Sequence, residues 1–155
     1  MKKAGLLLGI ALTSSLLTGC FISRNPIDAD AFRTKAEEAG YTVIGTTNNY
    51  PDGTAGDCLL AIKNPDGIEY QIEFVIVPTA VQAKTIYQEK KDEYESQKGT
   101  SSSHASVDIG NYSYYNLTAN GKYYLVSRTA NTFVFVEAPA KYKDEISDFI
   151  RSIGY

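Results

Sequence analysis

Two hairpin connections in the last third of the chain constrain its fold more than any other feature. Three segments there are rich in β-branched and aromatic residues: 109–117, 122–129 and 132–137. The connections between them are Asn120-Gly121 and Ala130-Asn131. Asn-Gly is the strongest two-residue turn signal between antiparallel strands, because both residues tolerate a positive φ. The three segments are therefore predicted to form an antiparallel meander.

A second triplet of strands is predicted nearer to the N-terminus. Its segments have strand composition and span residues 41–46, 58–63 and 68–77. The connection Asn64-Pro65-Asp66-Gly67 has the composition of a type I turn with proline at its second position. The strand after this turn alternates apolar and polar residues until Val75 and Val77 add apolar side chains to its polar face. We expect one face of this strand to be core and the other to become apolar towards its end.

Three helices complete the pattern. Asp28 is placed to cap the first helix, Thr79 and Gln82 have the spacing of a capping box, and Pro139 precedes a strongly amphipathic final segment. The resulting order is α-βββ-α-βββ-α. It predicts an α+β fold of two layers, with an antiparallel sheet of about six strands and three helices mainly on one face.

Length and charge limit the classes of function. The chain has 155 residues, and residues 28–155 are predicted to form a single globular domain. The formal net charge is −3. This acidic balance argues against nucleic acid or an anionic lipid surface as the main partner, since both require a basic patch.

The first twenty residues have the pattern of an export signal. Met1-Lys2-Lys3 gives a positive start, and an apolar run follows from Ala4 to Leu17. This run is shorter than the roughly 20 residues that span a bilayer. The sequence Leu17-Thr18-Gly19-Cys20 at its end resembles the lipobox of bacterial lipoproteins.

The resemblance to bacterial lipoproteins implies a cellular location. Residues 1–19 are then a cleaved signal peptide, Cys20 carries fatty acyl chains such as palmitate, and residues 20–27 are a short lipid-anchored leader. The protein is expected on the extracytoplasmic face of the cell membrane, or on the outer membrane if the host has two. The alternatives are an ordinary cleaved signal peptide with an incidental Cys20, and an uncleaved membrane anchor.

The end of the chain carries a second resemblance. The segments Tyr123–Arg128, Asn131-Thr132 and Tyr142–Tyr155 resemble a group of small lipoproteins of monoderm bacteria. This resemblance also implies a lipoprotein at the cell surface, and it indicates no enzymatic reaction.

Cysteine and histidine offer little chemistry. Cys58 is the one cysteine besides Cys20, so neither a disulfide framework nor a cysteine metal cluster is expected. It lies in an apolar stretch and is predicted to be a buried core thiol, with a reactive thiol as the alternative. His104, the only histidine, lies in the serine-rich segment 99–106, which is predicted to be a solvated loop. No catalytic residue, metal ligand or cofactor is assigned from the sequence.

Two groups of polar residues leave alternatives open. Residues 48–57 crowd Asn, Asp and Gly, which suits a Ca²⁺ or polar-ligand loop but equally a plain turn. Paired carboxylates can also supply acid and base catalysis in a small hydrolase or transferase. The candidates for such a pair are Asp52, Asp57, Asp66, Glu69 and Glu73.

Tyrosines on the predicted meander suggest a binding face. A ring with a polar tip can stack on a sugar or anchor a protein partner at a wet interface. The candidates are Tyr112, Tyr114, Tyr115, Tyr123 and Tyr124. The other interpretation is that they are core or ordinary sheet surface. The leading hypothesis is a non-catalytic binding or scaffold module with an envelope glycan or protein partner, and the alternatives are a carboxylate-based hydrolase or transferase and a structural subunit of an envelope assembly.

Overall fold

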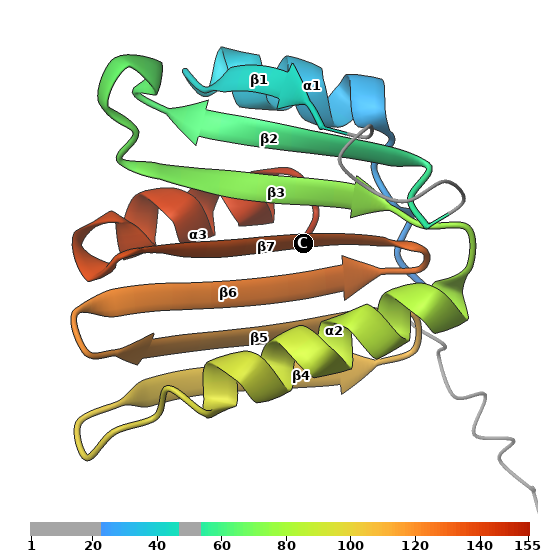
Figure 1. Ribbon diagram of the computed structural model, residues 1–155. Helices are drawn as coiled ribbons and strands as arrows, with labels where there is room; N and C mark the ends of the chain where they lie inside the picture. The colour runs from blue at the N-terminus through green and yellow to red at the C-terminus, as the bar shows by residue number, and fades with distance from the viewer. Residues whose placement is uncertain (1–22, 47–53) are drawn as a thin grey trace, which may run out of the picture.

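One antiparallel sheet organises the chain (Figure 1). The computed structural model describes residues 23–46 and 54–155. Its seven strands have the spatial order β1-β2-β3-β7-β6-β5-β4. They are β1 Thr42–Gly45, β2 Asp57–Lys63, β3 Tyr70–Ile76, β4 Ser103–Ile109, β5 Tyr112–Ala119, β6 Lys122–Thr129 and β7 Thr132–Pro139. The predicted α+β fold with an antiparallel sheet is confirmed.

The strand that the sequence did not reveal is β4. Residues 103–106 were predicted to belong to a loop with His104, but they form an edge strand that pairs with β5 from Ser103↔Thr118 to Ile109↔Tyr112. The turn between β4 and β5 is Gly110-Asn111, where Gly110 has a φ of 59°. All residues of β4 are exposed. Apolar and polar residues alternate from Ala105 to Ile109, but the serine-rich start of the strand was predicted as a loop and Ile109 was assigned to the following strand.

The centre of the sheet joins two sequential meanders. Strands β1 to β3 form the first and β4 to β7 the second, and they meet where β3 pairs with β7. This pairing sets Ile72 opposite Val136 and Phe74 opposite Val134. Because β3 and β7 are buried between other strands, their apolar residues form the middle of the core.

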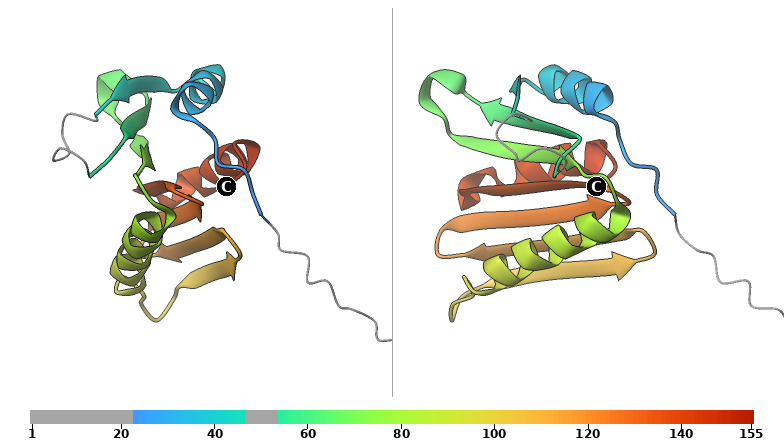
Figure 2. Two further views of the ribbon diagram at one scale, coloured as in Figure 1. Left: turned by 90° about the vertical axis from the view of Figure 1, so that its right-hand side faces the viewer. Right: turned by 45° about the vertical axis from the view of Figure 1, so that its right-hand side comes forward.

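The helices cover both faces of the sheet. Helices α1 (Ala29–Glu38) and α3 (Lys143–Ser152) pack on one face, and α2 (Ala80–Glu95) crosses the other (Figure 2). Two of the three α-helices in the described part of the chain therefore share a face. In the α1 and α3 layer, the Phe32 ring stacks on Phe74 with 4.5 Å between ring centroids and meets Phe149 edge-on at 6.1 Å.

Local signals begin the first two helices as predicted. The Asp28 carboxylate accepts a hydrogen bond from the Ala31 amide at 2.8 Å. The Thr79 hydroxyl accepts one from the Gln82 amide at 3.1 Å. Each bond satisfies an amide that has no partner within its helix. None of the helices within residues 23–46 and 54–155 has the length and apolar character needed to cross a membrane.

Candidate binding groove

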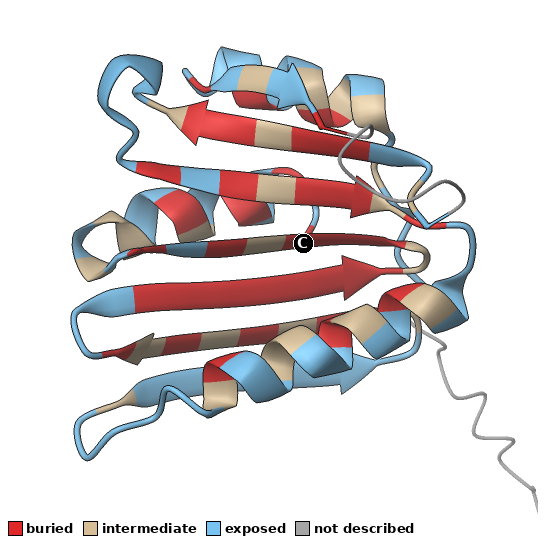
Figure 3. Cartoon of the chain, in the orientation of Figure 1, coloured by how far each residue is buried: buried red, intermediate tan, exposed pale blue. Residues whose placement is uncertain are grey.

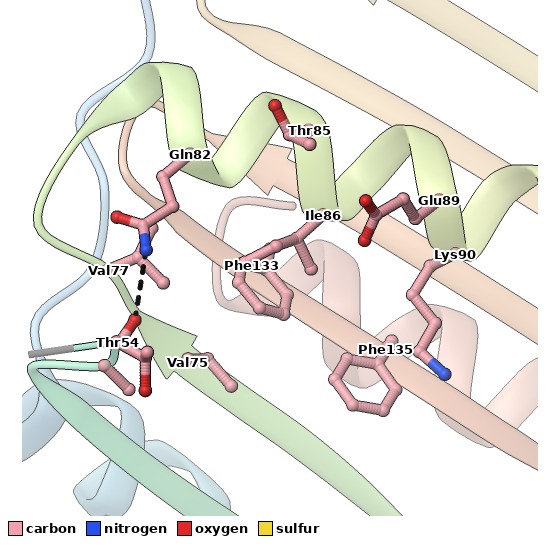
Figure 4. A pocket seen from close by; sticks show the side chains of 11 residues that line it. Thr54, Val75, Val77, Gln82, Thr85, Ile86, Glu89, Lys90, Phe133 and Phe135 are labelled. Atoms are coloured by element: carbon pink, nitrogen blue, oxygen red, sulfur yellow. Dashed lines mark hydrogen bonds between the residues drawn. The ribbon is translucent and has the colours of Figure 1, made fainter. Parts of the chain in front are cut away.

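Helix α2 covers only part of its face of the sheet and leaves a groove along its side. A pocket of about 470 Å³ lies between α2 and strands β3 and β7 (Figure 4). Its floor is apolar and consists of Val75, Val77, Phe133 and Phe135, with Ile86 of α2 on its wall. Its polar rim comes from Thr54 and from the α2 residues Gln82, Thr85, Glu89 and Lys90. The volume lies in the range of pockets that take small organic molecules or a few side chains.

Strand register explains why the floor is apolar. Phe133 lies opposite Val75 on the neighbouring strand β3, and Phe135 lies opposite Val126 of β6. Side chains of directly opposite residues point to the same face of a sheet, so these residues share one surface. The Val75 and Val77 side chains that break the alternation of their strand therefore have a structural role. They extend the apolar surface beyond the edge of α2.

A second, polar compartment continues the groove towards the C-terminal end of α2. This pocket of about 150 Å³ shares Lys90 and Phe135 with the first. The Lys90 ammonium lies 2.8 Å from a Glu93 carboxylate oxygen and 5.0 Å from the centre of the Phe135 ring. Three carboxylates line the compartment: Glu73, Glu93 and Glu137. The groove is thus apolar at one end and acidic at the other.

The Cys58 thiol is buried on the face of the sheet that α2 covers. The Thr46 hydroxyl donates to its sulfur at 2.9 Å, and the thiol donates to a Glu73 carboxylate oxygen at 3.3 Å. The side chain is fully buried in a cluster with Val75, Val77 and Phe133. The prediction of a buried core thiol is confirmed.

The five candidate tyrosines do not form one exposed face (Figure 3). Tyr112, Tyr115, Tyr123 and Tyr124 are buried, and Tyr114 is half-buried. Tyr123 faces α3, where its hydroxyl lies 3.0 Å from that of Ser147, whereas Tyr124 packs under Tyr94 of α2. Burial raises the pKa of Tyr123 well above its usual value. These tyrosines belong to the cores on both sides of the sheet.

Among the described candidate carboxylates, Asp57 and Glu73 do not form a pair. Asp57 and Glu73 point to opposite faces of the sheet, because Asp57 precedes Cys58 on β2 and Glu73 lies opposite Leu60. Asp66 and Glu69 are exposed at the β2–β3 connection and do not line either compartment of the groove. Asp52, with most of the predicted ligand loop 48–57, lies outside the described residues. Within the described part of the chain, no three His, Cys, Asp or Glu side chains are grouped to hold a metal ion.

The groove is the site that sequence reasoning missed. The sequence marks Gln82 only as part of a capping box and Glu89 and Lys90 only as charged residues of the same helix. Their position beside an apolar floor depends on how α2 crosses the sheet. The one signal in the sequence was the run Phe74–Val77, where both faces of β3 become apolar. Comparison with protein families, curated proteins and solved structures finds no match to this chain.

Proposed function

We propose that this chain is a lipid-anchored protein of the extracytoplasmic membrane face that binds a protein partner through the groove beside α2, without catalysing a reaction. The membrane location is supported by the lipobox resemblance at Cys20. The binding role is supported by one observation, the continuity of an apolar pocket with an acidic one. The partner presents a large apolar side chain with a Lys or Arg close to it.

The apolar compartment favours an aliphatic or aromatic anchor. Its floor is built from phenylalanine and valine side chains that the sheet holds in place, so little ordering is required when a ligand binds. Partly exposed aromatic and aliphatic side chains such as Phe135 and Ile86 are typical of the small central region that dominates binding energy. Each apolar side chain that enters the pocket gains about 25 cal/mol per Å² of buried apolar surface.

The acidic compartment selects the charge of the partner. Among the described residues that line the two compartments, Glu73, Glu89, Glu93 and Glu137 outnumber the single amine of Lys90. Glu137 is also ion-paired with Lys122, and Glu93 with Lys90, so the four carboxylates exceed the two amines by two. An excess of carboxylates repels fatty acids, phospholipid headgroups and phosphorylated ligands. It attracts a basic side chain and aligns it with the apolar anchor.

A matched pair of peptides tests the groove. Chemical shifts of Val75, Ile86 and Phe135 are recorded with a ten-residue peptide in which Phe and Arg are three positions apart, and with the same peptide carrying Glu in place of Arg. We expect shifts at the groove with the first peptide and at least about tenfold weaker binding of the second. Equal binding of both peptides, or shifts confined to other parts of the surface, contradicts the proposal.

A pair of variants on α2 separates the groove from the rest of the helix. Ile86→Glu places a charge over the apolar floor and should abolish binding of the Phe-Arg peptide. Val81→Glu makes the same kind of change on the solvent side of α2, where Val81 is 78% exposed, and should leave binding unchanged. Loss of binding in both variants, with both folded, argues against the groove as the site.

The membrane location is tested separately. Cys20→Ala removes the acyl acceptor that the lipobox resemblance implies, so the chain should leave the membrane fraction of its host. Intact-mass measurement of the wild-type protein should show an acylated chain that starts at Cys20. A mass that includes Met1, or that lacks acyl groups, contradicts the lipid-anchored location. The peptide test of the groove is unaffected by that result.

A further inference from the structure

Among residues 23–46 and 54–155, no strand pairs with the outer edge of β4. The seven residues of β4, Ser103–Ile109, are all exposed (Figure 3). Val107 and Ile109 are 45% and 43% exposed. Natural sheets protect such edges with short strands, charged side chains (above all Lys), Pro or bulges. The one acidic residue of β4 is Asp108. Residues 103–109 contain no Lys, Arg or Pro, and their pairing with β5 is continuous. The opposite edge strand, β1, is protected by its length of four residues.

The turn between β4 and β5 shows which backbone groups face outward. Ile109 and Tyr112 flank the two-residue turn Gly110-Asn111 and form the closing hydrogen-bonded pair of the hairpin. Hydrogen-bonded and non-hydrogen-bonded pairs alternate along an antiparallel ladder. The N–H and C=O groups of His104, Ser106 and Asp108 therefore point away from β5, to the open edge.

The sequence of β4 is complementary to itself. If a second copy of β4 pairs antiparallel with the first and Ser106 faces Ser106, His104 lies opposite Asp108 of the second copy. Both residues point to the α2 face, because β4 pairs His104 with Leu117 and Asp108 with Ser113. The Asp108 carboxylate is held in place by a hydrogen bond from the Ser113 hydroxyl at 2.8 Å. On the other face, Ala105 lies opposite Val107, which brings two apolar side chains together.

We propose that β4 is the interface between two copies of this chain, which pair antiparallel about a two-fold axis at Ser106 and extend one sheet across both. The outward groups of three residues in each copy then form about six inter-strand hydrogen bonds. An isologous contact of this kind closes after two copies, because the same edge is used by both. The groove beside α2 takes no part in the contact, so this inference is independent of the binding proposal.

The position of the leader fits such a pair. Residues 23–28 run along the α1 and α3 side of the sheet (Figure 2). A two-fold axis normal to the sheet keeps the same faces of both copies on the same side. Both leaders can therefore reach one membrane, and both grooves face away from it. This support rests on the proposed lipid anchor at Cys20: confinement to a membrane raises the effective concentration of the copies and favours an interface as small as one strand pair.

Charges placed on the two-fold axis test the interface. The full chain is expressed in its host with two different tags, and membranes are solubilised in mild detergent before one tag is captured. Wild-type copies should capture one another. Ser106→Asp and Ser106→Lys should each reduce self-capture by about tenfold, because each places like charges opposite one another. Co-expression of the Asp variant with the Lys variant should restore capture, since the charges are then complementary.

Control variants outside β4 show whether a loss of capture is specific to the proposed interface. Ser101→Asp and Ser101→Lys make the same changes at an exposed serine outside β4 and should leave capture unchanged. His104→Asp places an aspartate opposite Asp108 of the second copy and should also reduce self-capture. The proposal is overturned if wild-type copies fail to capture one another, if capture is insensitive to Ser106→Asp and Ser106→Lys, or if the mixture of the two variants does not recover it. Recovery also shows that both variants fold.

Discussion

The guanidinium carbon of Arg24 lies 3.5 Å from the centre of the Tyr112 ring, so the described part of the leader, residues 23–27, is attached to the β4–β5 hairpin as well as to the first helix. The Arg24 amide donates to the Asn111 side-chain oxygen at 2.9 Å, and the Asn111 side-chain amide donates to the Arg24 carbonyl at 2.7 Å. The Arg24 guanidinium also donates to the Gly154 carbonyl at 3.1 Å. The leader thus contacts both the hairpin and the end of the chain. If Cys20 carries lipid, the domain is held within a few residues of the membrane.

Removing the Asn111 side chain should release the leader. Asn111→Ala deletes both hydrogen bonds to the Arg24 backbone while Arg24 itself remains a trypsin site. We expect the rate of tryptic cleavage after Arg24 to increase several-fold, because a protease requires a locally released chain. Cleavage after Arg33, within α1, serves as the internal control and should be unchanged. An unchanged rate after Arg24 shows that these bonds do not hold the leader.

Truncating Phe32 should destabilise the domain more than any change at its surface. Phe32 is fully buried between Phe74 and Phe149, and the Ala side chain leaves a cavity where the ring was. We expect Phe32→Ala to lower the free energy of unfolding by about 3–5 kcal/mol in urea denaturation. Ile68→Ala, at a residue that is 60% exposed, should change it by less than about 0.5 kcal/mol. Similar losses in both variants contradict this account of the core.

Stability should fall at alkaline pH, in part through Tyr87. Burial, followed by the nearby Asp108 carboxylate, raises the pKa of Tyr87 to about 12 in the folded protein. In the unfolded chain tyrosine ionises near pH 10. Between these two values the folded state holds a proton that the unfolded state has lost. The free energy of unfolding therefore decreases as the pH rises from 10 to 12 and is unaffected by this group below pH 10.

The variant Tyr87→Phe isolates this contribution. Phenylalanine has no ionisable group, so the slope of unfolding free energy against pH between 10 and 12 should become shallower, by at most about 1.4 kcal/mol per pH unit. Urea denaturation at a series of pH values measures the slope, and the range from pH 6 to 8 is the control in which the two proteins should run parallel. Identical slopes above pH 10 would show that Tyr87 ionises alike in both states.

Cys58 should be inert in the folded protein. Its thiol is fully buried and hydrogen-bonded to Thr46 and Glu73, and a thiolate is required for reaction with alkylating reagents. We expect iodoacetamide to label the peptide containing Cys58 only after denaturation, as read by mass spectrometry. Rapid labelling of native protein at this peptide contradicts the buried environment.

Local signals in the sequence were enough for most elements. The turn at Asn120-Gly121 depends on two residues that adopt a φ of 52° and 76°, and the caps at Asp28 and Thr79 depend on a bond across three residues. Such interactions close within a few residues, so composition and spacing reveal them. Strand β4 was not predicted because its serine-rich start has the composition of a loop and its alternation of apolar and polar residues, from Ala105 to Ile109, is short.

The sequence by itself determined the hairpins, the helix starts and the α+β class, whereas only the tertiary structure decided what the surfaces became. The pairing of β3 with β7 and the crossing of α2 bring residues together that are far apart in the chain, such as Ile86 and Phe135 in the groove. The same arrangement buried Tyr115 and Tyr124 under α2, where the sequence had suggested a binding face. The physical reason is that local preferences fix which side chains share a face, while burial depends on which element covers that face.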